Sequence, residues 1–553
     1  MNNTLLWLWR VTGKKKYYIA ALTLIQALQG LLSVLYALLF RNFVDSAVSR
    51  DAEAFLHNTV LIICLFIIQI GIDAVVRWLH GLAAAEFENL FKQQLTDNIL
   101  RKNYFYVSAI HTAEWLNRLT NDTSVVAGGC VDILPGLVET VVRLISALIM
   151  ILILQPFFAY ILVPGGIIVI LLTYVFRKHL KRLHKNIQER DGKLRIFLQE
   201  HIGNLMLIKS FAAENQTSLG AADEMKQHKA AKMKRLLFSN VANTGFAFIM
   251  DGMYLACIIY CVRGIFTGTG TYGTLAAVMH LVGQVQGPFA NISGYLPRFY
   301  AMTASAERLM EIEAAEDDKT PRPASEVQDF YTNSFLSVSL RNAGFSYETE
   351  DNAPAVLNGV SLEIRKGECV AFTGYSGCGK STVLKLLMCM YPLHEGRCCL
   401  TTVQGDTDLD SSWRRLFAYV PQGNALMNGT IREVVSFADP SAAQDEERLR
   451  HALKIACADD FVDNADAVLG ERGCSLSEGQ MQRIAIARAV FADCPILLLD
   501  ESTSALDEIT EARLLENIHS LTDKTVVIVT HRKAALSICD RVLQFTETGV
   551  QEV

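Results

Sequence analysis

The sequence predicts a multidomain protein, with an all-α transmembrane domain followed by a soluble α/β domain. Three observations support this division. Hydrophobic residues make up 51% of the 553 residues and charged residues only 20%. Long uncharged runs are confined to the region before about residue 300. After that point apolar segments alternate with helical ones, and one of them leads through a glycine-rich loop into a helix, as in a sheet with packed helices. The chain is also too long for one ordinary domain.

The first part of the chain contains six candidate membrane spans. A helix that crosses a bilayer needs about 20 mostly apolar residues. The uncharged run 144–176 is too long for one span, and we divide it at Gln155-Pro156, because proline interrupts a helix. The expected spans are 17–40, 54–76, 132–154, 157–176, 236–262 and 273–297.

The distribution of basic residues predicts the orientation of these spans. Four basic residues precede the first span, and the segments 77–131 and 177–235 are also rich in lysine and arginine, whereas the three opposite loops hold few. Basic loops stay in the cytoplasm. We therefore expect a multi-pass protein of the plasma or inner membrane, in contact with the lipid bilayer, with both termini cytoplasmic. The two basic segments contain few turn residues and are expected to form long cytoplasmic helix extensions.

The expected domain boundaries follow from composition. The transmembrane domain covers 1–312, and a charged, proline-containing linker covers 313–334. The soluble domain covers 335–553. A net charge of −6 gives no indication of nucleic-acid binding. The 13 cysteines contain no C-x-x-C pair, which favours free thiols in a reducing compartment over a zinc site.

The glycine-rich loop at 374–382 predicts a nucleotide site. It matches G-x-x-x-x-G-K-[ST] and lies between an apolar strand and a helix, so a turn that binds nothing is disfavoured. Backbone N–H groups of such a loop surround a polyphosphate, Lys380 reaches the β- and γ-phosphates, and Ser381 binds Mg²⁺. We expect ATP and Mg²⁺ as cofactors. The loop members are Gly374, Tyr375, Ser376, Gly377, Cys378, Gly379, Lys380, Ser381 and Thr382.

Two carboxylates follow a second apolar strand, 496–499. In enzymes with this loop, such an aspartate holds Mg²⁺, so Asp500 is the expected metal residue. The next residue, Glu501, is placed to polarise the water that attacks the γ-phosphate. This pattern alone is weak evidence, but it gains weight beside the phosphate loop.

Further motifs give the soluble domain a family resemblance. Residues 476–480 read Leu-Ser-Glu-Gly-Gln, and they resemble the signature motif of ATP-binding-cassette (ABC) transporters, with Glu478 where glycine is commonest. The match to that family's nucleotide-binding domain runs from about residue 335 to the end. It implies that the following residues also take part: Gln422 (glutamine loop, Mg²⁺ and catalysis), His531 (switch histidine), Asp507 (D-loop), Tyr347 (adenine stacking), and Ser477, Gly479 and Gln480 (signature).

The resemblance extends to the exporter type of ABC protein. The loop 469–473, the stretch 304–309 after the sixth span, and coupling regions near 104–111 and 203–211 are similar to that group. This implies a half-transporter in which two chains enclose ATP between the phosphate loop of one and the signature of the other. A homodimer is favoured because this chain has Glu501, and a heterodimer stays possible.

The expected function is ATP-driven export of a peptide, lipid or small molecule by alternating access. The alternatives are an exporter-folded importer of metal chelates, and an ATP-regulated channel or membrane subunit. A soluble ABC ATPase of translation or DNA repair is disfavoured by the six spans. The transported solute is unidentified. Candidate contacts with the solute are Asp251 of the fifth span and the polar residues Gln284, Gln286 and Asn291 of the sixth span. The alternative for Asp251 is a structural ion pair with Arg143 of the third span.

Overall fold

The computed structural model describes residues 2–347, 355–423, 426–470, 476–546 and 549–553. Its contacts divide the chain into two compact units. The helical unit contains the residues up to Thr96 together with Leu116–Glu311. The α/β unit contains Asp97–Trp115 and Ile312–Val553. The short segment between the second and third predicted spans therefore packs with the soluble domain.

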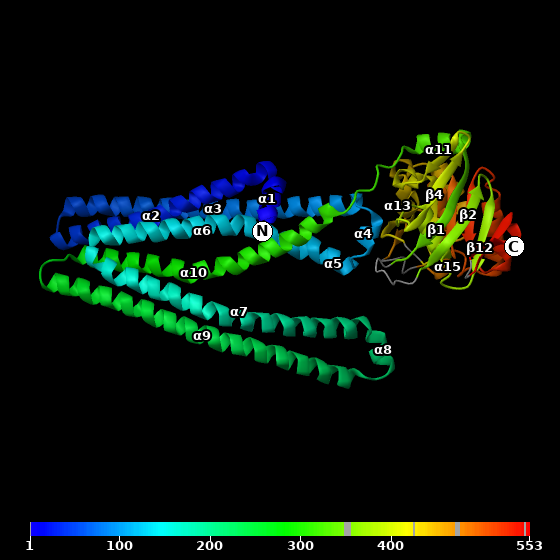
Figure 1. The fold of residues 1–553 in the computed structure, drawn as a ribbon. Coiled ribbons are helices and arrows are strands. Elements are labelled where there is room, and N and C mark those ends of the chain that lie inside the picture. The colour runs from blue at the N-terminus through cyan, green and yellow to red at the C-terminus, as the bar shows by residue number, and fades with distance from the viewer. Residues whose placement is uncertain (1, 348–354, 424–425, 471–475, 547–548) are drawn as a thin grey trace. The chain divides into compact units, whose positions relative to one another are not determined.

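The helical unit is built from long helices (Figure 1). α2, α6 and α10 pack against one another, and α7 packs against α9 to form a hairpin closed by the short helix α8. α6 ends at Leu154, and a 3-10 turn at Pro156–Phe158 leads into α7, as the proline predicts. The bounds are α1 Asn2–Val11, α2 Lys16–Ser49, α3 Ala52–Arg101, α6 Thr123–Leu154, α7 Ala159–Gly203, α8 Leu205–Ser210, α9 Glu214–Phe266 and α10 Tyr272–Glu311.

Four helical segments of the described part are long and apolar enough to cross a membrane. They are Gly13–Ser49, Ala52–Arg101, Thr112–Leu154 and Glu214–Phe266. Apolar side chains along them point outward; Ile63, Ile67 and Ile70 on α3, for example, are each more than half exposed, which suits a lipid-facing surface. The predicted span 157–176 begins in the 3-10 turn Pro156–Phe158 and continues into α7, and the predicted span 273–297 lies within α10. The count of six spans stays a prediction.

The ion pair that Arg143 forms in the helical unit differs from the expected pair with Asp251. Arg143 pairs with Glu139, one turn earlier on α6, and not with Asp251, which is exposed on α9. An i,i+4 partner on the same helix is reached without crossing to another helix. Gly30 of α2 lies beside this pair, and a Cβ there would be 3.2 Å from the Glu139 carbonyl oxygen. Close packing of α2 on α6 thus needs a glycine at this position.

The α/β unit contains two main sheets. The larger has the order β12-β11-β3-β10-β9-β6 and is parallel except for β12. The smaller is antiparallel, in the order β2-β1-β4-β5. The strands are β1 Phe335–Phe345, β2 Leu357–Arg365, β3 Cys369–Gly374, β4 Glu395–Thr402, β5 Gly405–Asp408, β6 Phe417–Val420, β9 Ile496–Asp500, β10 Thr525–Val529, β11 Arg541–Thr546 and β12 Gly549–Glu552, with a small pair β7 Gly429–Thr430 and β8 Val468–Leu469.

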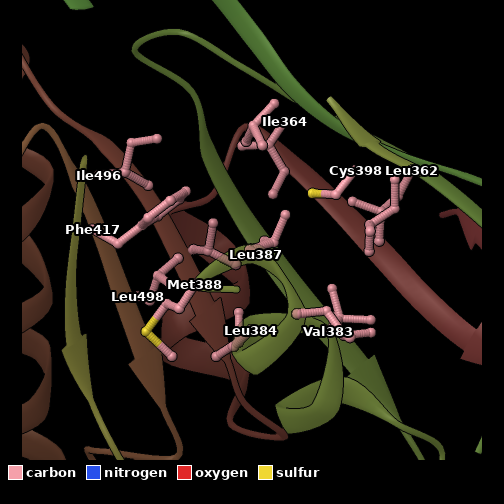
Figure 2. Close-up of a cluster of buried hydrophobic side chains, with 14 of the residues drawn as sticks. Leu362, Ile364, Val383, Leu384, Leu387, Met388, Cys398, Phe417, Ile496 and Leu498 are labelled. Atoms are coloured by element: carbon pink, nitrogen blue, oxygen red, sulfur yellow. The ribbon is translucent and has the colours of Figure 1, made fainter. Parts of the chain in front are cut away.

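Helices cover these sheets, and α12 fills the space between them. Val383, Leu384 and Leu387 of α12 contact side chains from both sheets in one buried cluster (Figure 2). The phosphate loop therefore begins and ends in rigid elements. The helices are α4 Tyr104–Ser108, α5 Thr112–Asn117, α11 Ala324–Asn333, α12 Lys380–Leu387, α13 Ile431–Val435, α14 Glu446–Ile455, α15 Glu478–Phe491, α16 Glu508–His519 and α17 Lys533–Ile538.

The segment 313–334, predicted as a linker, forms ion pairs and hydrogen bonds with other parts of the α/β unit. The Lys102 ammonium lies 2.8 Å from the Asp317 carboxylate, and the two residues form a β-bridge. Asp318 accepts two hydrogen bonds from Arg414, at 2.7 and 3.2 Å. The charges that marked this segment as a linker are thus used in pairing. They attach it both to the end of α3, just before α4, and to the 3-10 turn Ser411–Leu416.

Candidate functional site

The phosphate loop has the curled shape that its glycines predict. Gly374, Gly377 and Gly379 have φ of +137°, +88° and +96°, values that side chains disfavour. Lys380 is 5% exposed, and its ammonium donates to the carbonyl oxygens of Gly374 (2.8 Å) and Tyr375 (3.0 Å). The loop therefore holds its lysine in the concavity where the polyphosphate is expected.

A hydroxyl and a carboxylate of the predicted metal site are in contact. Ser381 donates to Asp500 Oδ1 at 2.8 Å, and Tyr419 donates to Asp500 Oδ2 at 3.0 Å. Burial raises the pKa of Asp500, and these two hydrogen bonds oppose that rise. β6 and β9 are parallel neighbours, so Tyr419 and Asp500 reach the same edge of the sheet. The sequence motifs give no role to Tyr419, and only the strand register identifies it.

The three predicted catalytic residues converge at Glu501. Gln422 donates to the Glu501 carboxylate at 2.7 Å, and His531 Nε2 lies 3.9 Å from its other oxygen. Glu501 has a φ of +49°, and its backbone N–H donates to the Val529 carbonyl oxygen. This unusual backbone conformation turns the side chain at the strand end. It is consistent with a site that holds a carboxylate in a functional position.

Tyr347 belongs to an aromatic cluster beside the phosphate loop. Its hydroxyl is 3.0 Å from Thr382 Oγ1, and its ring is 41% exposed, which leaves it open to stacking. The ring of Tyr391 meets Tyr347 edge to face, with centroids 5.3 Å apart. Tyr391 also meets Tyr104 and Phe105 of α4, at 5.7 and 6.0 Å. The adenine-binding candidate is thus linked to the first coupling region, a link that the sequence did not predict.

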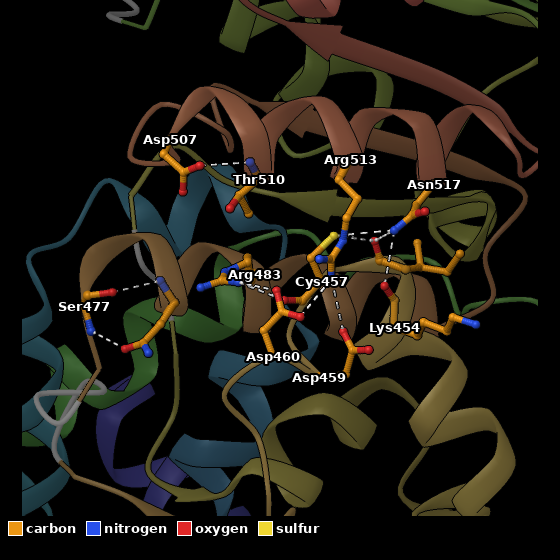
Figure 3. Close-up of polar contacts among 12 residues, drawn as sticks. Lys454, Cys457, Asp459, Asp460, Ser477, Arg483, Asp507, Thr510, Arg513 and Asn517 are labelled. Carbon is orange, nitrogen blue, oxygen red and sulfur yellow. Dashed lines mark hydrogen bonds and ion pairs between the residues drawn. The ribbon is translucent and has the colours of Figure 1, made fainter.

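The signature residues form the beginning of α15. Ser477 caps this helix by accepting from the Gln480 backbone N–H, and Gln480 in turn accepts from the Ser477 N–H (Figure 3). A Cβ at Gly479 would lie 2.9 Å from the Ala505 carbonyl oxygen. Among the described residues, no hydrogen bond or ion pair joins these three to the phosphate loop of the same chain.

The D-loop is held by the residue after the switch histidine. Arg532 donates to the backbone oxygens of Ser504 (2.6 Å) and Leu506 (2.9 Å) and pairs with the buried Glu511 (2.7 Å). Asp507 caps α16 by accepting from the Thr510 N–H, and this hydrogen bond lowers the pKa of Asp507 (Figure 3). The sequence motifs did not single out Arg532, and no spacing rule identifies it.

Some predicted residues lie outside what the structure describes. Residues 471–473 of the exporter-type loop are outside the described part, and so are the side chains of Gln286 and Asn291. Gln284 is described and lies 3.3 Å from His280, on the same helix. The predicted coupling regions 104–111 and 203–211 contain the short helices α4 and α8.

Comparisons with known proteins agree with this geometry. Residues 19–289 match the family model described as the ABC transporter transmembrane region, and residues 357–504 match the model described as ABC transporter. A putative export ATP-binding/permease protein of Rickettsia conorii is 27% identical over 97% of this chain and 93% of its own length. A multidrug resistance ABC transporter ATP-binding and permease protein of Lactococcus lactis is 25% identical over 94% and 88%.

A solved structure shares the fold. A bacterial Atm1-family ABC exporter with ATP bound superposes with a TM-score of 0.80 at 21% identity, over 97% of this chain and 94% of the other. The chain is therefore a multi-pass membrane protein that carries its own ATP-binding domain. It belongs to the ABC transporters, of the exporter type, and its ATPase domain hydrolyses ATP in coupling with transport.

Proposed function

We propose that this protein exports a solute from the cytoplasm, driven by ATP binding and hydrolysis at two sites shared between two chains. One observation carries the proposal: Glu501 contacts Gln422 and lies near His531 beside a complete phosphate loop. A regulatory subunit or a gated channel has no need of an intact hydrolytic carboxylate. The relatives described as export ATP-binding/permease proteins support the direction.

The residues present suit a magnesium ion. Mg²⁺ prefers oxygen ligands and usually shares its site with substrate phosphates. Ser381 Oγ and the Asp500 carboxylate provide such oxygens 2.8 Å apart, and the Gln422 side chain is near through Glu501. When bound, the ion neutralises charge that develops on the phosphates. We assign Ser381, Asp500 and Gln422 to hold it.

Each remaining residue then has one role in hydrolysis. Tyr347 stacks on adenine, and Lys380 neutralises the β- and γ-phosphates. Glu501 orients a water molecule and accepts its proton, while His531 donates a hydrogen bond to the γ-phosphate. The hydrogen bond from Gln422 to Glu501 keeps this general base next to a residue that we assign to hold Mg²⁺.

A second chain completes the two sites. Within the described part of the chain, the signature residues make no hydrogen bond or ion pair to their own phosphate loop, whereas a helix N-terminus suits the γ-phosphate of another chain. α8 and the residue that follows it supply a second reason, because they expose four apolar side chains outside the predicted spans: Leu205, Met206 and Leu207 of α8, and Phe211, each more than half exposed. We assign this apolar tip to contact with the partner chain, in a homodimer.

Closure of the two ATPase domains on ATP would favour an outward-facing membrane cavity, and hydrolysis would restore the inward-facing one. We place the protein in the plasma or inner membrane with both termini cytoplasmic. This orientation follows from the basic segments and puts the ATPase domain where ATP is.

Vesicle uptake tests the direction of transport. Inside-out and right-side-out vesicles that carry the protein are incubated with a cell metabolite extract and ATP, and their contents are analysed by mass spectrometry. Vesicles with Glu501→Gln are the control. Export predicts solutes enriched only in inside-out vesicles with the native chain. Enrichment only in right-side-out vesicles loaded with ATP would identify an importer. Hydrolysis of ATP without enrichment of any solute would favour an ATP-regulated channel or membrane subunit.

A further inference from the structure

Two cysteines lie in contact at the edge of the six-stranded sheet opposite the phosphate loop. Cys369 is the first residue of β3, and Cys539 lies between α17 and β11. β3 and β11 are parallel neighbours, so the amino ends of the two strands lie side by side. The two sulfur atoms are 3.4 Å apart, and both thiols are free.

The backbone holds this pair in place. Asp540 follows Cys539, and its N–H donates to the Cys369 carbonyl oxygen at 2.8 Å. Its carboxylate accepts from the Cys369 N–H, also at 2.8 Å. Two hydrogen bonds therefore fix the segment that carries one thiol against the segment that carries the other.

The two thiols have different environments. Cys369 is 6% exposed, whereas Cys539 is partly exposed. The hydrogen bond between them lowers the pKa of Cys539, and that contact together with burial raises the pKa of Cys369. A more acidic, accessible thiol next to a second thiol is the arrangement of a redox-sensing cysteine and its resolving partner.

We propose that Cys539 and Cys369 form a reversible disulfide when the protein meets a hydroperoxide, and that this disulfide slows ATP hydrolysis. The Cys539 thiolate attacks one peroxide oxygen and becomes a sulfenic acid, and the departing hydroxide takes up a proton to form water. The Cys369 sulfur then attacks the sulfenic sulfur, the S–O bond breaks and a second water leaves. The two thiols lose two electrons, and the hydrogen peroxide is reduced to two waters. A small dithiol reverses the reaction by exchange.

α17 connects this pair to the catalytic residues. It begins at Lys533, directly after Arg532, which holds the D-loop, and two residues after His531. A disulfide shortens the sulfur separation to about 2.05 Å, so its formation draws the end of α17 toward β3. Displacement of a catalytic group by about 1 Å can cost a hundredfold in rate. The sulfur separation changes by an amount of that order, and we infer that α17 carries part of the change to Arg532 and the switch histidine.

The test uses the full chain in lipid nanodiscs. The protein is treated with hydrogen peroxide and alkylated, and peptides are analysed by mass spectrometry while ATP turnover is measured before and after dithiothreitol. We expect a peptide that joins Cys369 to Cys539, and a fall in turnover of up to about a hundredfold that dithiothreitol reverses.

Three serine variants make the test specific. Cys539→Ser and Cys369→Ser are expected to hydrolyse ATP normally and to lose the reversible inhibition. Cys494→Ser removes a partly buried thiol elsewhere and should respond like the native chain. Cys378 of the phosphate loop is present in every sample, so its own oxidation affects all of them equally. Absence of the joined peptide, or equal inhibition of the native chain and both pair variants, would overturn the proposal.

Discussion

At the scale of single residues, two variants of Tyr347 separate the contribution of its ring to ATP binding from that of its hydroxyl. Its ring is available to adenine, while its hydroxyl bonds to Thr382. Tyr347→Ala removes both, and Tyr347→Phe removes only the hydroxyl. Stacking of a base on an aromatic ring contributes about 1–3 kcal/mol, so the alanine variant should bind ATP roughly tenfold more weakly. Calorimetric titration with ATP measures this. A phenylalanine variant as weak as the alanine variant would show that the hydroxyl, and not the ring, binds the nucleotide.

Asp500 predicts a pH dependence of stability. Burial raises its pKa in the folded protein above the unfolded value. Between these two pKa values the folded state binds more protons, so this group's contribution to the free energy of unfolding falls as pH rises through that window. At neutral pH the ionised carboxylate therefore destabilises the nucleotide-free domain.

Asp500→Asn should accordingly raise the melting temperature at neutral pH while it abolishes ATP hydrolysis. The difference from the native chain should shrink as pH falls toward the ordinary carboxyl range. Thermal unfolding at several pH values checks this, with the exposed Asp523→Asn as control. A lower melting temperature for Asp500→Asn at neutral pH would contradict the role given to burial.

At the scale of elements, the packing of α15 on the D-loop depends on one missing side chain. Gly479→Ala would place a Cβ 2.9 Å from the Ala505 carbonyl oxygen. Overpacking of this kind costs about 1–3 kcal/mol, so we expect a lower melting temperature and reduced ATP turnover. Gly192→Ala, on a helix with open space around it, is the matched control. ATP turnover at the native rate in Gly479→Ala would show that the D-loop can move to accommodate the added methyl group without loss of activity.

Tyr391 is the element-scale test of coupling. Its ring lies between Tyr347 and the aromatic residues of α4, and each such edge-to-face pair contributes about 0.5–1.5 kcal/mol. Tyr391→Ala should keep ATP turnover but weaken the response of the membrane helices to ATP. Spin-label distances in the loop between α2 and α3 of two chains report that response. Tyr391→Phe retains the ring and should behave as the native chain does; equal loss in both variants would point to the hydroxyl.

The sequence predicted the elements that carry the phosphate loop and Asp500 but not the contacts between them. The phosphate loop, the strand that ends at Asp500 and the break at Pro156 follow from local patterns, because backbone preference and burial determine them. Arg532, Tyr419 and Tyr391 act through neighbours that lie 28, 81 and 287 residues away in the sequence, which are Ser504, Asp500 and Tyr104. Only strand register and packing bring such residues together. The ion pairs of the predicted linker were missed for the same reason, because charges that mark a connecting segment also form ion pairs when partners are near.

At the scale of the whole molecule, the account requires that one kind of chain can build two working ATP sites. The catalytic cluster at Glu501 and the capped signature helix are both present in this chain, so two copies provide every part. A heterodimer would instead need a partner to supply what this chain lacks. The two cases differ in what the purified chain does alone.

ATP hydrolysis by the chain purified alone in lipid nanodiscs therefore tests the central claim most directly, with Glu501→Gln beside it and the exposed Glu516→Gln as control. Loss of a general base typically costs about 10²–10⁴-fold, so turnover should disappear in Glu501→Gln while ATP binding persists. The Glu516→Gln variant should hydrolyse ATP as the native chain does. Hydrolysis by Glu501→Gln at the native rate would contradict the catalytic assignment, and a silent native chain that still binds ATP would contradict the homodimer.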